Sequence, residues 1–244
     1  MLFAAGLGTR LRPLTEHTPK PLIRVGRSAL IEQTLARLEA HGIERIVVNT
    51  HHHAAQLAAY LAARESPSEI VISHEPTLLE TGGGIVQALP WLGEAPFFSA
   101  NSDAFWIDGA TPALARLAEA FDPERMDALL LLVDPARAVG YSGGGDFELT
   151  AENQLSRAGR RLIFSGLQIF HPRLFAAHQA QAGARPFSLR EIYAAAEQAD
   201  GRLSRMFGLL HDADWVHVGA PHELAAAEAY MARTGALPPG GRVQ

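Results

Sequence analysis

The residues best suited to chemistry gather in the first 27 positions, around a lone lysine. This segment carries one acid, Glu16, and five basic residues: Arg10, Arg12, Lys20, Arg24 and Arg27. Lys20 is the only lysine of a 244-residue chain that has 20 arginines and a formal net charge of −5. An ammonium group is a compact point charge with three donors, which a planar guanidinium does not replace. Because phosphate groups are bound by clustered cations, we predict a phosphate site rather than only a solvated basic loop.

A glycine-containing loop precedes this lysine. Gly6-Leu7-Gly8 follows an apolar run, and its backbone N–H groups are free to bind phosphate oxygens. A dinucleotide-binding loop would have a third glycine where Leu11 stands and would open a helix at once, which Pro13 disfavours. A P-loop would end in Gly-Lys-Ser/Thr, which is absent here. The sequence thus disfavours a dinucleotide-dependent oxidoreductase.

Alternating strands and helices must position this loop. Apolar runs predict buried strands at Leu2–Ala5, Arg45–Asn49, Glu69–Ser73, Phe97–Asn101 and Ala128–Val133. Helical spacing predicts helices from Leu30 to Gly42 with Ser28 as N-cap, at Ala54–Ala63, after the glycine cluster Gly82–Gly84, and at Thr111–Phe121. This order predicts an α/β fold: a Rossmann-like three-layer α/β/α arrangement with a mostly parallel, mixed central sheet, whose ligands bind beyond the carboxyl ends of the strands.

The pattern changes after the strand that ends at Val133. We expect antiparallel strands at Phe147–Leu149 and Arg161–Phe170, a helix at Ser188–Ala199, strands at Leu203–Leu210 and Trp215–Val218, and a last helix at Pro221–Arg233. We expect one domain over residues 1–234, with a nucleotide-binding half (1–133) and a half for a second substrate (134–234). Residues 235–244 are expected to form a flexible tail, and the short first strand suggests a natural start further upstream.

Composition excludes several classes of protein. The chain is 48% apolar, mildly acidic and free of cysteine, so disulfide scaffolds, thiol nucleophiles and cysteine metal sites are excluded. Mild acidity argues against a general nucleic-acid binder, and no apolar run is long enough to span a membrane. We expect a cytoplasmic protein that acts on small molecules, as a monomer or a homodimer.

Several motifs resemble one family. Residues 4–15, AAGLGTRLRPLT, followed by TPKPL, resemble the signature of the sugar-1-phosphate nucleotidyltransferases. Glu80-Thr81-Gly82-Gly83-Gly84 resembles their base-recognition turn, Asn101-Ser102-Asp103 their strand-end metal motif, and Trp215–Gly219 their second metal strand. The resemblance implies the nucleotide-diphospho-sugar transferase type of fold, and substrates that are a nucleoside triphosphate and a sugar 1-phosphate.

The resemblance also implies roles for individual residues. The nucleotide would be bound by Ala4, Ala5, Gly6, Gly8, Thr9, Arg10, Lys20, Thr81, Gly82 and Asn101. Arg10, Lys20 and Asp103 would be catalytic, with the two cations stabilising charge at the phosphoryl group. An aspartate after a strand also serves as a simple turn residue, but Asp103 stands where the ligand is expected.

The metal site departs from the family pattern. Asp103 would hold Mg²⁺, or Mn²⁺ or another divalent metal, but His217 stands where relatives commonly have Asp or Asn. Imidazole suits Zn²⁺ or Ni²⁺ better than Mg²⁺. His217 either ligates a different metal, acts through a water, or marks a non-catalytic regulatory protein that binds a nucleotide sugar. Asp212 and Asp214 are candidates to compensate, although their odd offsets from His217 place them on the opposite strand face.

The choice of sugar rests on a narrower likeness. Gly145–Leu149 and Phe164-Ser165-Gly166 resemble the compact N-acetylmuramate-1-phosphate uridylyltransferases of cell wall recycling, so Asp146, Ser165 and Gly166 are the expected sugar-binding residues. The first hypothesis is thus UTP with N-acetylmuramate 1-phosphate, and the alternative enzyme is a mannose-1-phosphate guanylyltransferase. The run His51–His53 is interpreted as a solvated loop and not as a metal site.

Overall fold

A large mixed sheet organises the chain in the computed structural model, which describes residues 1–179 and 185–235. Its strands lie in the order β10 (Glu148–Leu149), β11 (Gln154–Ser156), β13 (Arg202–Leu210), β8 (Ala128–Val133), β12 (Ile163–Phe170), β6 (Phe97–Asn101), β1 (Leu2–Phe3), β4 (Arg45–Thr50) and β5 (Glu69–His74). Only β12 and β11 run opposite to the other strands. The predicted α/β fold with a mostly parallel, mixed sheet is confirmed.

Two apolar layers cover the sheet because side chains of a strand alternate between its faces. In β8, Leu129, Leu131 and Val133 enter the cluster formed with α1 (Leu30–Ala40), α2 (Ala54–Ala63) and α4 (Ala113–Ala120). The alternate residues, Ala128, Leu130 and Leu132, enter the cluster formed with α3 (Glu80–Leu92) and α6 (Leu189–Ala195). Helices therefore lie on both faces, and the three-layer arrangement is confirmed.

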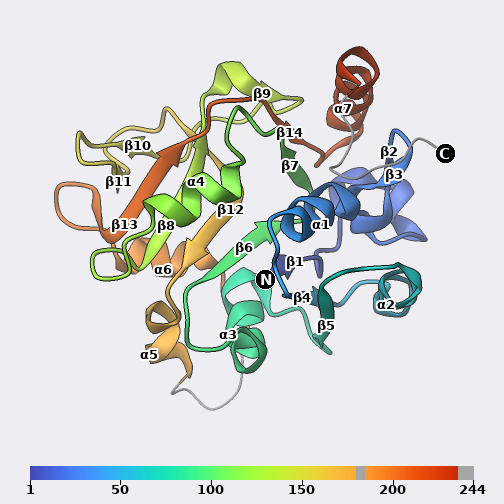
Figure 1. Cartoon of the computed structure of the whole chain (residues 1–244), viewed down its shortest axis with the longest axis horizontal. Coiled ribbons are helices and arrows are strands. Elements are labelled where there is room, and N and C mark those ends of the chain that lie inside the picture. The colour runs from blue at the N-terminus through green and yellow to red at the C-terminus, as the bar shows by residue number, and fades with distance from the viewer. Residues whose placement is uncertain (180–184, 236–244) are drawn as a thin grey trace.

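Smaller sheets complete the architecture. β14 (Trp215–His217) pairs with β7 (Ala104–Trp106) and β9 (Ala138–Val139), and α7 (Pro221–Thr234) packs on them. The hairpin of β2 (Arg24–Val25) and β3 (Ser28–Ala29) lies next to α7, as Figure 1 shows. The remaining helix is α5 (Ala176–Gln179), and short 3-10 turns occur at Thr9–Leu11, Leu14–Glu16, Lys20–Leu22, Pro135–Arg137 and Pro172–Phe175.

The two halves of the sequence join in the middle of the main sheet. β12 pairs antiparallel with β6 on one side and with β8 on the other. One continuous sheet therefore contains strands from both the 1–133 and the 134–234 segments. Apart from Gly235, the predicted tail lies outside the described residues.

Two local expectations are wrong. Ser28 belongs to β3 and does not cap α1, which begins at Leu30 after Ala29; its hydroxyl instead accepts a hydrogen bond from Gln33 Nε2 at 3.0 Å. Gly82–Gly84 do not form a turn before α3 but lie inside it. Glycine at position 82 serves close packing rather than a turn, because an added Cβ would lie 2.3 Å from the Phe187 ring. In the part of the chain that the structure describes, no helix has the length and apolarity needed to cross a membrane.

Candidate active site

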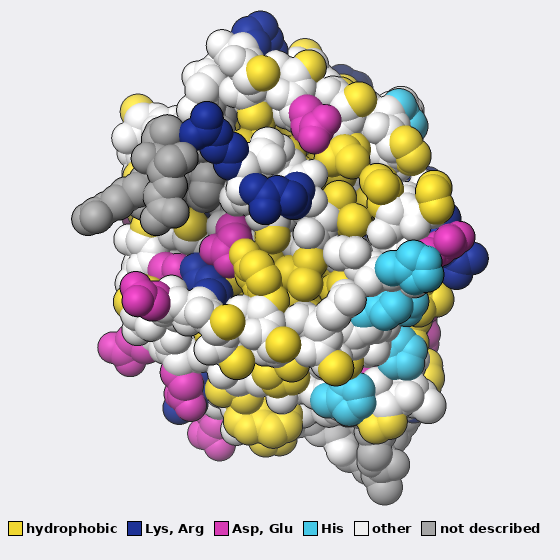
Figure 2. All heavy atoms as spheres, turned by 90° about the vertical axis from the view of Figure 1, so that its right-hand side faces the viewer, with side chains coloured by type: hydrophobic (Ala, Val, Ile, Leu, Met, Phe, Trp, Pro, Cys, Tyr) yellow, Lys and Arg dark blue, Asp and Glu magenta, His cyan; other side chains and the backbone are white. Residues whose placement is uncertain are grey.

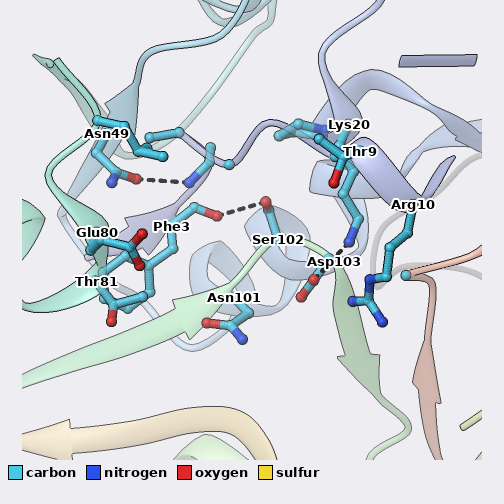
Figure 3. Close-up of a pocket in the computed structure, with 17 residues that line it drawn as sticks. Phe3, Thr9, Arg10, Lys20, Asn49, Glu80, Thr81, Asn101, Ser102 and Asp103 are labelled. Atoms are coloured by element: carbon cyan, nitrogen blue, oxygen red, sulfur yellow. Dashed lines mark hydrogen bonds and ion pairs between the residues drawn. The ribbon is translucent and has the colours of Figure 1, made fainter. Parts of the chain in front are cut away.

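A cavity of about 360 Å³ opens at the carboxyl ends of β1 and β6. The predicted site residues that line it are Ala4, Ala5, Gly6, Gly8, Thr9, Arg10, Lys20, Thr81, Asn101 and Asp103. Figure 3 shows Lys20, Arg10 and Asp103 together on one side of this cavity, and Asn49, Glu80 and Thr81 on the other. The fold thus brings residues from the first loop, from α3 and from the end of β6 to one place.

The glycine loop owes its shape to Gly8. Gly8 has φ +63°, a conformation that favours glycine, and its carbonyl accepts a hydrogen bond from Thr15 Oγ1 at 2.8 Å. A Cβ at this position would lie 2.9 Å from Thr15 Cγ2 and 3.0 Å from Lys20 Cβ. Gly8 therefore allows the loop to fold back onto the segment that carries Lys20.

An ion pair links that segment to the end of β6. Lys20 Nζ lies 2.7 Å from Asp103 Oδ2, and the two side chains are 12% and 27% exposed. Burial alone would raise the pKa of the Asp103 carboxyl, but the positive charge of Lys20 and its hydrogen bond hold that pKa below its usual value. The carboxylate thus stays ionised, and the sole lysine points into the cavity rather than into solvent.

Asp103 retains an unused ligand atom. Its Oδ1 is buried and has no hydrogen-bond partner among the described residues. His217 Nε2 lies 3.9 Å from the other carboxylate oxygen, Oδ2. The unpaired Asp103 oxygen and the nearby imidazole are donor types that divalent cations bind, although His217 itself lines neither cavity.

Within residues 1–179 and 185–235, however, no group of three or more histidines, aspartates or glutamates converges on one point. Mg²⁺ is often held in proteins by one or two carboxylates together with substrate phosphates. The pair is therefore suited to a cation that shares its ligands with a bound phosphate.

A buried glutamate that sequence reasoning missed supports His217. Glu223 lies in the first turn of α7 and is 4% exposed. Its Oε2 accepts the Gly219 N–H at 2.6 Å and lies 3.1 Å from His217 Nδ1. A carboxylate on one ring nitrogen leaves the other, Nε2, to face Asp103. The residue type and position did not indicate a buried role for Glu223, because glutamates in a first helical turn are common on protein surfaces.

The other two acids near β14 do not enter the site. Asp212 pairs with Arg116 at 2.7 Å, and Asp214 accepts a hydrogen bond from Tyr230 at 3.0 Å. Neither lines the cavity. The hypothesis that they compensate for His217 receives no support from this geometry.

A second polar network fixes the opposite wall of the cavity. Asn49 Oδ1 accepts the Ala4 N–H at 2.7 Å, and its amide donates to Glu75 Oε1 at 2.7 Å. Glu75 is fully buried, which raises the pKa of its carboxyl, and it also accepts the Leu79 N–H at 2.9 Å. The network ties the start of the glycine loop to β4 and to the approach to α3, and no motif in the sequence indicated it.

A second cavity, of about 670 Å³, adjoins the first. Asp146, a predicted sugar-binding residue, lines it, and Thr81 and Asn101 line both cavities. Thr81 Oγ1 accepts the Leu189 N–H at 3.0 Å, whereas the Asn101 side chain has no hydrogen bond within the described residues. The amide of Asn101 is thus available to a ligand in either cavity.

Four predicted residues line neither cavity: Gly82, Ser165, Gly166 and His217. Gly82 donates its N–H to Phe187 at 2.9 Å and lines neither cavity. Ser165 is buried, and its hydroxyl accepts the Leu167 N–H at 3.1 Å. Gly166, with φ +85°, makes room for Asn101, whose Nδ2 would lie 2.8 Å from an added Cβ. Contacts of these residues with substrate stay predictions.

The histidine run braces the first loop. Ring nitrogens of His51, His52 and His53 lie 2.8, 3.1 and 3.0 Å from the backbone carbonyl oxygens of Glu75, Thr15 and Glu16. Figure 2 shows several histidine side chains gathered along one edge of the face of the molecule that it displays. His52 and His53 thus attach the 15–16 segment to the start of α2, and His51 contacts the residue after β5. The run forms a loop as predicted, but its side chains are half-buried rather than fully solvated.

The buried contact between Glu223 and the Gly219 N–H can be tested by mutation. We expect Glu223→Ala to lower the free energy of unfolding by about 1–3 kcal/mol, because the buried Gly219 N–H loses its acceptor. Glu228→Ala, on an exposed position of the same helix, is the matched control and should change stability far less. Urea denaturation followed by circular dichroism measures both, and equal losses would show that Glu223 contributes no more than helix propensity.

Comparison with known proteins places this chain in a family. A model described as nucleotidyl transferase matches residues 1–144. An N-acetylmuramate α-1-phosphate uridylyltransferase of Caulobacter vibrioides is 42% identical over 95% of this chain and 96% of its own length. The enzyme of the same name from Neisseria meningitidis is 34% identical over 94% and 96%.

Solved structures agree on the fold. A UDP-glucose pyrophosphorylase from Acinetobacter baumanii superposes with a TM-score of 0.74 at 17% identity, over 98% of this chain and 94% of that one. The inositol-1-phosphate CTP transferase from T. maritima gives 0.72 at 16% identity, over 94% of each chain. The chain belongs to the nucleotidyl transferase family, as its motifs indicated.

Proposed function

We propose that the protein transfers the uridylyl group of UTP to N-acetylmuramate 1-phosphate and releases pyrophosphate. The observation that carries this proposal is the near full-length similarity to two uridylyltransferases of that name. The two adjoining cavities support it, since one has phosphate-binding character and the other has room for a sugar. A place in cell wall recycling, in the cytoplasm, follows as part of the proposal.

In this reaction a phosphate oxygen of the sugar 1-phosphate forms a bond to the α-phosphorus of UTP, while the bond from that phosphorus to the pyrophosphate oxygen breaks. Both substrates are anions, so their approach is opposed by charge repulsion. The Lys20 ammonium, held at 2.7 Å from Asp103, and the Arg10 guanidinium on the same side of the cavity offset that repulsion. The backbone N–H groups around Gly6 and Gly8 are suited to bind the leaving pyrophosphate.

We infer that Asp103 and His217 would hold a divalent metal, Mg²⁺ or Mn²⁺, together with the phosphates. When bound, such a cation neutralises charge on the phosphoryl oxygens and orients them for displacement. Glu223 positions His217 for this role. Because imidazole suits Zn²⁺ or Ni²⁺ better than Mg²⁺, the histidine favours a metal with a higher affinity for nitrogen ligands than Mg²⁺ has.

A pyrophosphate-release assay tests the function. We expect turnover with UTP and N-acetylmuramate 1-phosphate, loss of turnover in EDTA, and a kcat/KM with Mn²⁺ at least equal to that with Mg²⁺. The four nucleoside triphosphates and mannose 1-phosphate serve as comparison substrates, because relatives named mannose-1-phosphate guanyltransferase match at 26–29% identity. Preference for GTP with mannose 1-phosphate would replace our substrate assignment, and no turnover with any pair would refute it.

A further inference from the structure

The histidine run between β4 and α2 lies outside both cavities, yet each of its rings is held in place. Ring nitrogens of His51, His52 and His53 lie within 3.1 Å of backbone carbonyl oxygens from other segments. None of the three residues lines either cavity. Because a carbonyl oxygen only accepts hydrogen bonds, each of these nitrogens must carry a proton and donate it. The run therefore supplies three ordered donors that the reaction itself does not use.

Three donors at the start of α2 meet three successive carbonyl groups of the first loop. The Nε2 atoms of His52, His53 and Gln56 lie 3.1, 3.0 and 3.0 Å from the carbonyl oxygens of residues 15, 16 and 17, in that order. His51 ties the same run to the main sheet, because its Nδ1 lies 2.8 Å from the carbonyl oxygen of the residue after β5. We call His52, His53 and Gln56 the clamp. It fixes a continuous stretch of backbone rather than a single point.

The backbone of His53 is strained in a way that local structure does not require. His53 has φ +51° and ψ 39°, a left-handed conformation that residues with a Cβ seldom adopt. It precedes α2, where a short polar side chain usually caps the helix, but its ring makes no capping hydrogen bond. Strained residues of this kind persist where surrounding contacts fix them, and they gather at functional positions. The His53 ring thus serves the loop instead of the helix.

The stretch that the clamp holds is packed against the glycine loop and Lys20. Thr15 is 1% exposed, and its hydroxyl donates to the Gly8 carbonyl at 2.8 Å. A Cβ added at Gly8 would lie 2.9 Å from Thr15 Cγ2 and 3.0 Å from Lys20 Cβ, so the three residues are in close contact. Displacement of Thr15 would therefore disturb both the N–H groups of the loop and the ammonium that faces Asp103.

We propose that His52 and His53 are positioning residues, which hold the glycine loop and Lys20 in the geometry that binds the triphosphate. They act only through Thr15 and the segment that follows it. Without their two donors, a smaller fraction of molecules would hold this geometry, and the apparent dissociation constant of the nucleotide rises as that fraction falls. The inference rests on the proposed function for the identity of the nucleotide, but the position of the loop can be measured without it.

Lys20 reports the position of the loop directly, because it is the only lysine of the chain. Its side chain is 12% exposed and paired with Asp103, so acylation requires the loop to open. His52→Phe/His53→Phe keeps two rings but removes the donors. In the substrate-free protein, we expect this change to speed acetylation of Lys20 by N-hydroxysuccinimidyl acetate about 5-fold or more, as measured by mass spectrometry. His17→Phe is the matched control and should leave the rate unchanged, because the exposed His17 ring has no hydrogen bond among the described residues.

Turnover separates positioning from a general loss of structure. With UTP and N-acetylmuramate 1-phosphate, we expect the double phenylalanine variant to raise KM for UTP about 10-fold. Its kcat and its KM for the sugar phosphate should stay within about 2-fold, because saturating UTP restores the ordered loop. His52→Gln/His53→Gln keeps an N–H donor at the place of Nε2, as Gln56 does. It should return both the labelling rate and KM to within about 2-fold of the unmodified protein.

Unchanged labelling of Lys20 in the folded phenylalanine variant would overturn the proposal, whatever the substrate, as would equal acceleration in His17→Phe. An equal rise in KM for both substrates, or failure of the glutamine variant to restore KM, would show that the histidines only support the fold. Circular dichroism checks folding. If the double variant is unfolded, His52→Phe replaces it, with an expected increase of about 3-fold in both labelling and KM for UTP. No turnover by the unmodified protein would refute the proposed function instead, and labelling would still decide the role of the clamp.

Discussion

Replacement of Lys20 by methionine is expected to lower kcat/KM by about 100- to 1,000-fold while the protein remains folded. The loss follows from removing a fixed charge where the transferred phosphoryl group develops negative charge, the size of effect seen when one such donor is deleted from an enzyme site. Methionine has a similar length without the charge. Steady-state pyrophosphate release measures the rate, and circular dichroism with urea denaturation measures folding.

Lys20→Arg should fail to restore the rate, because the ammonium occupies a confined position: its side chain is 12% exposed, and its Nζ lies 2.7 Å from Asp103 Oδ2. Arg27→Met, an exposed cation of the same segment, is the matched control and should stay within about 2-fold of the unmodified enzyme. A Lys20→Met enzyme that keeps a third or more of its activity would refute the role given to this ammonium.

Asp103→Asn is expected to lower kcat by about 1,000-fold or more, the second large effect. The amide keeps the shape of the side chain but removes the charge that faces Lys20, and it offers a much weaker ligand to a cation. Binding of Mn²⁺ to the enzyme with UTP, followed by electron paramagnetic resonance, should weaken at least 10-fold. Asp200→Asn, at an exposed position, is the control.

The double variant Lys20→Met/Asp103→Asn separates two roles of the ion pair. If the two groups act as one unit at the phosphoryl centre, the double variant should be scarcely worse than either single one. Fully additive losses would show instead that Lys20 and Asp103 act on separate steps. Retention of Mn²⁺ affinity in Asp103→Asn would remove this residue from the metal site altogether.

The position of Asp103 was predictable, because it follows a buried strand whose carboxyl end lies at the ligand-binding edge of the sheet. Lys20 was assigned to the same site from its charge and from the family resemblance. The layering was also predictable, since strict alternation in β8 sends successive leucines to opposite faces. These features depend on the periodicity of apolar residues and on the order of strands and helices, both of which can be read from a single sequence.

Other features depend on contacts between distant segments. Gly82 looked like a turn residue, yet its lack of a side chain serves the approach of Phe187, more than 100 positions away. Glu75 and Glu223 read as ordinary surface acids, and only the folded chain shows that each is buried against backbone N–H groups. Ser28 met the local rule for a helix cap, but pairing in the β2–β3 hairpin decided its position.

The wall shared by the two cavities has a consequence for inhibitor design. Thr81 and Asn101 border both hollows, so a single elongated molecule that fills the two at once would cover this wall from either side. Such a molecule should bind with higher affinity, because once one half is bound, binding of the attached second half loses less entropy than binding of a separate compound. Uridine-based compounds that extend from the first cavity into the second should therefore bind with higher affinity than fragments that occupy one cavity.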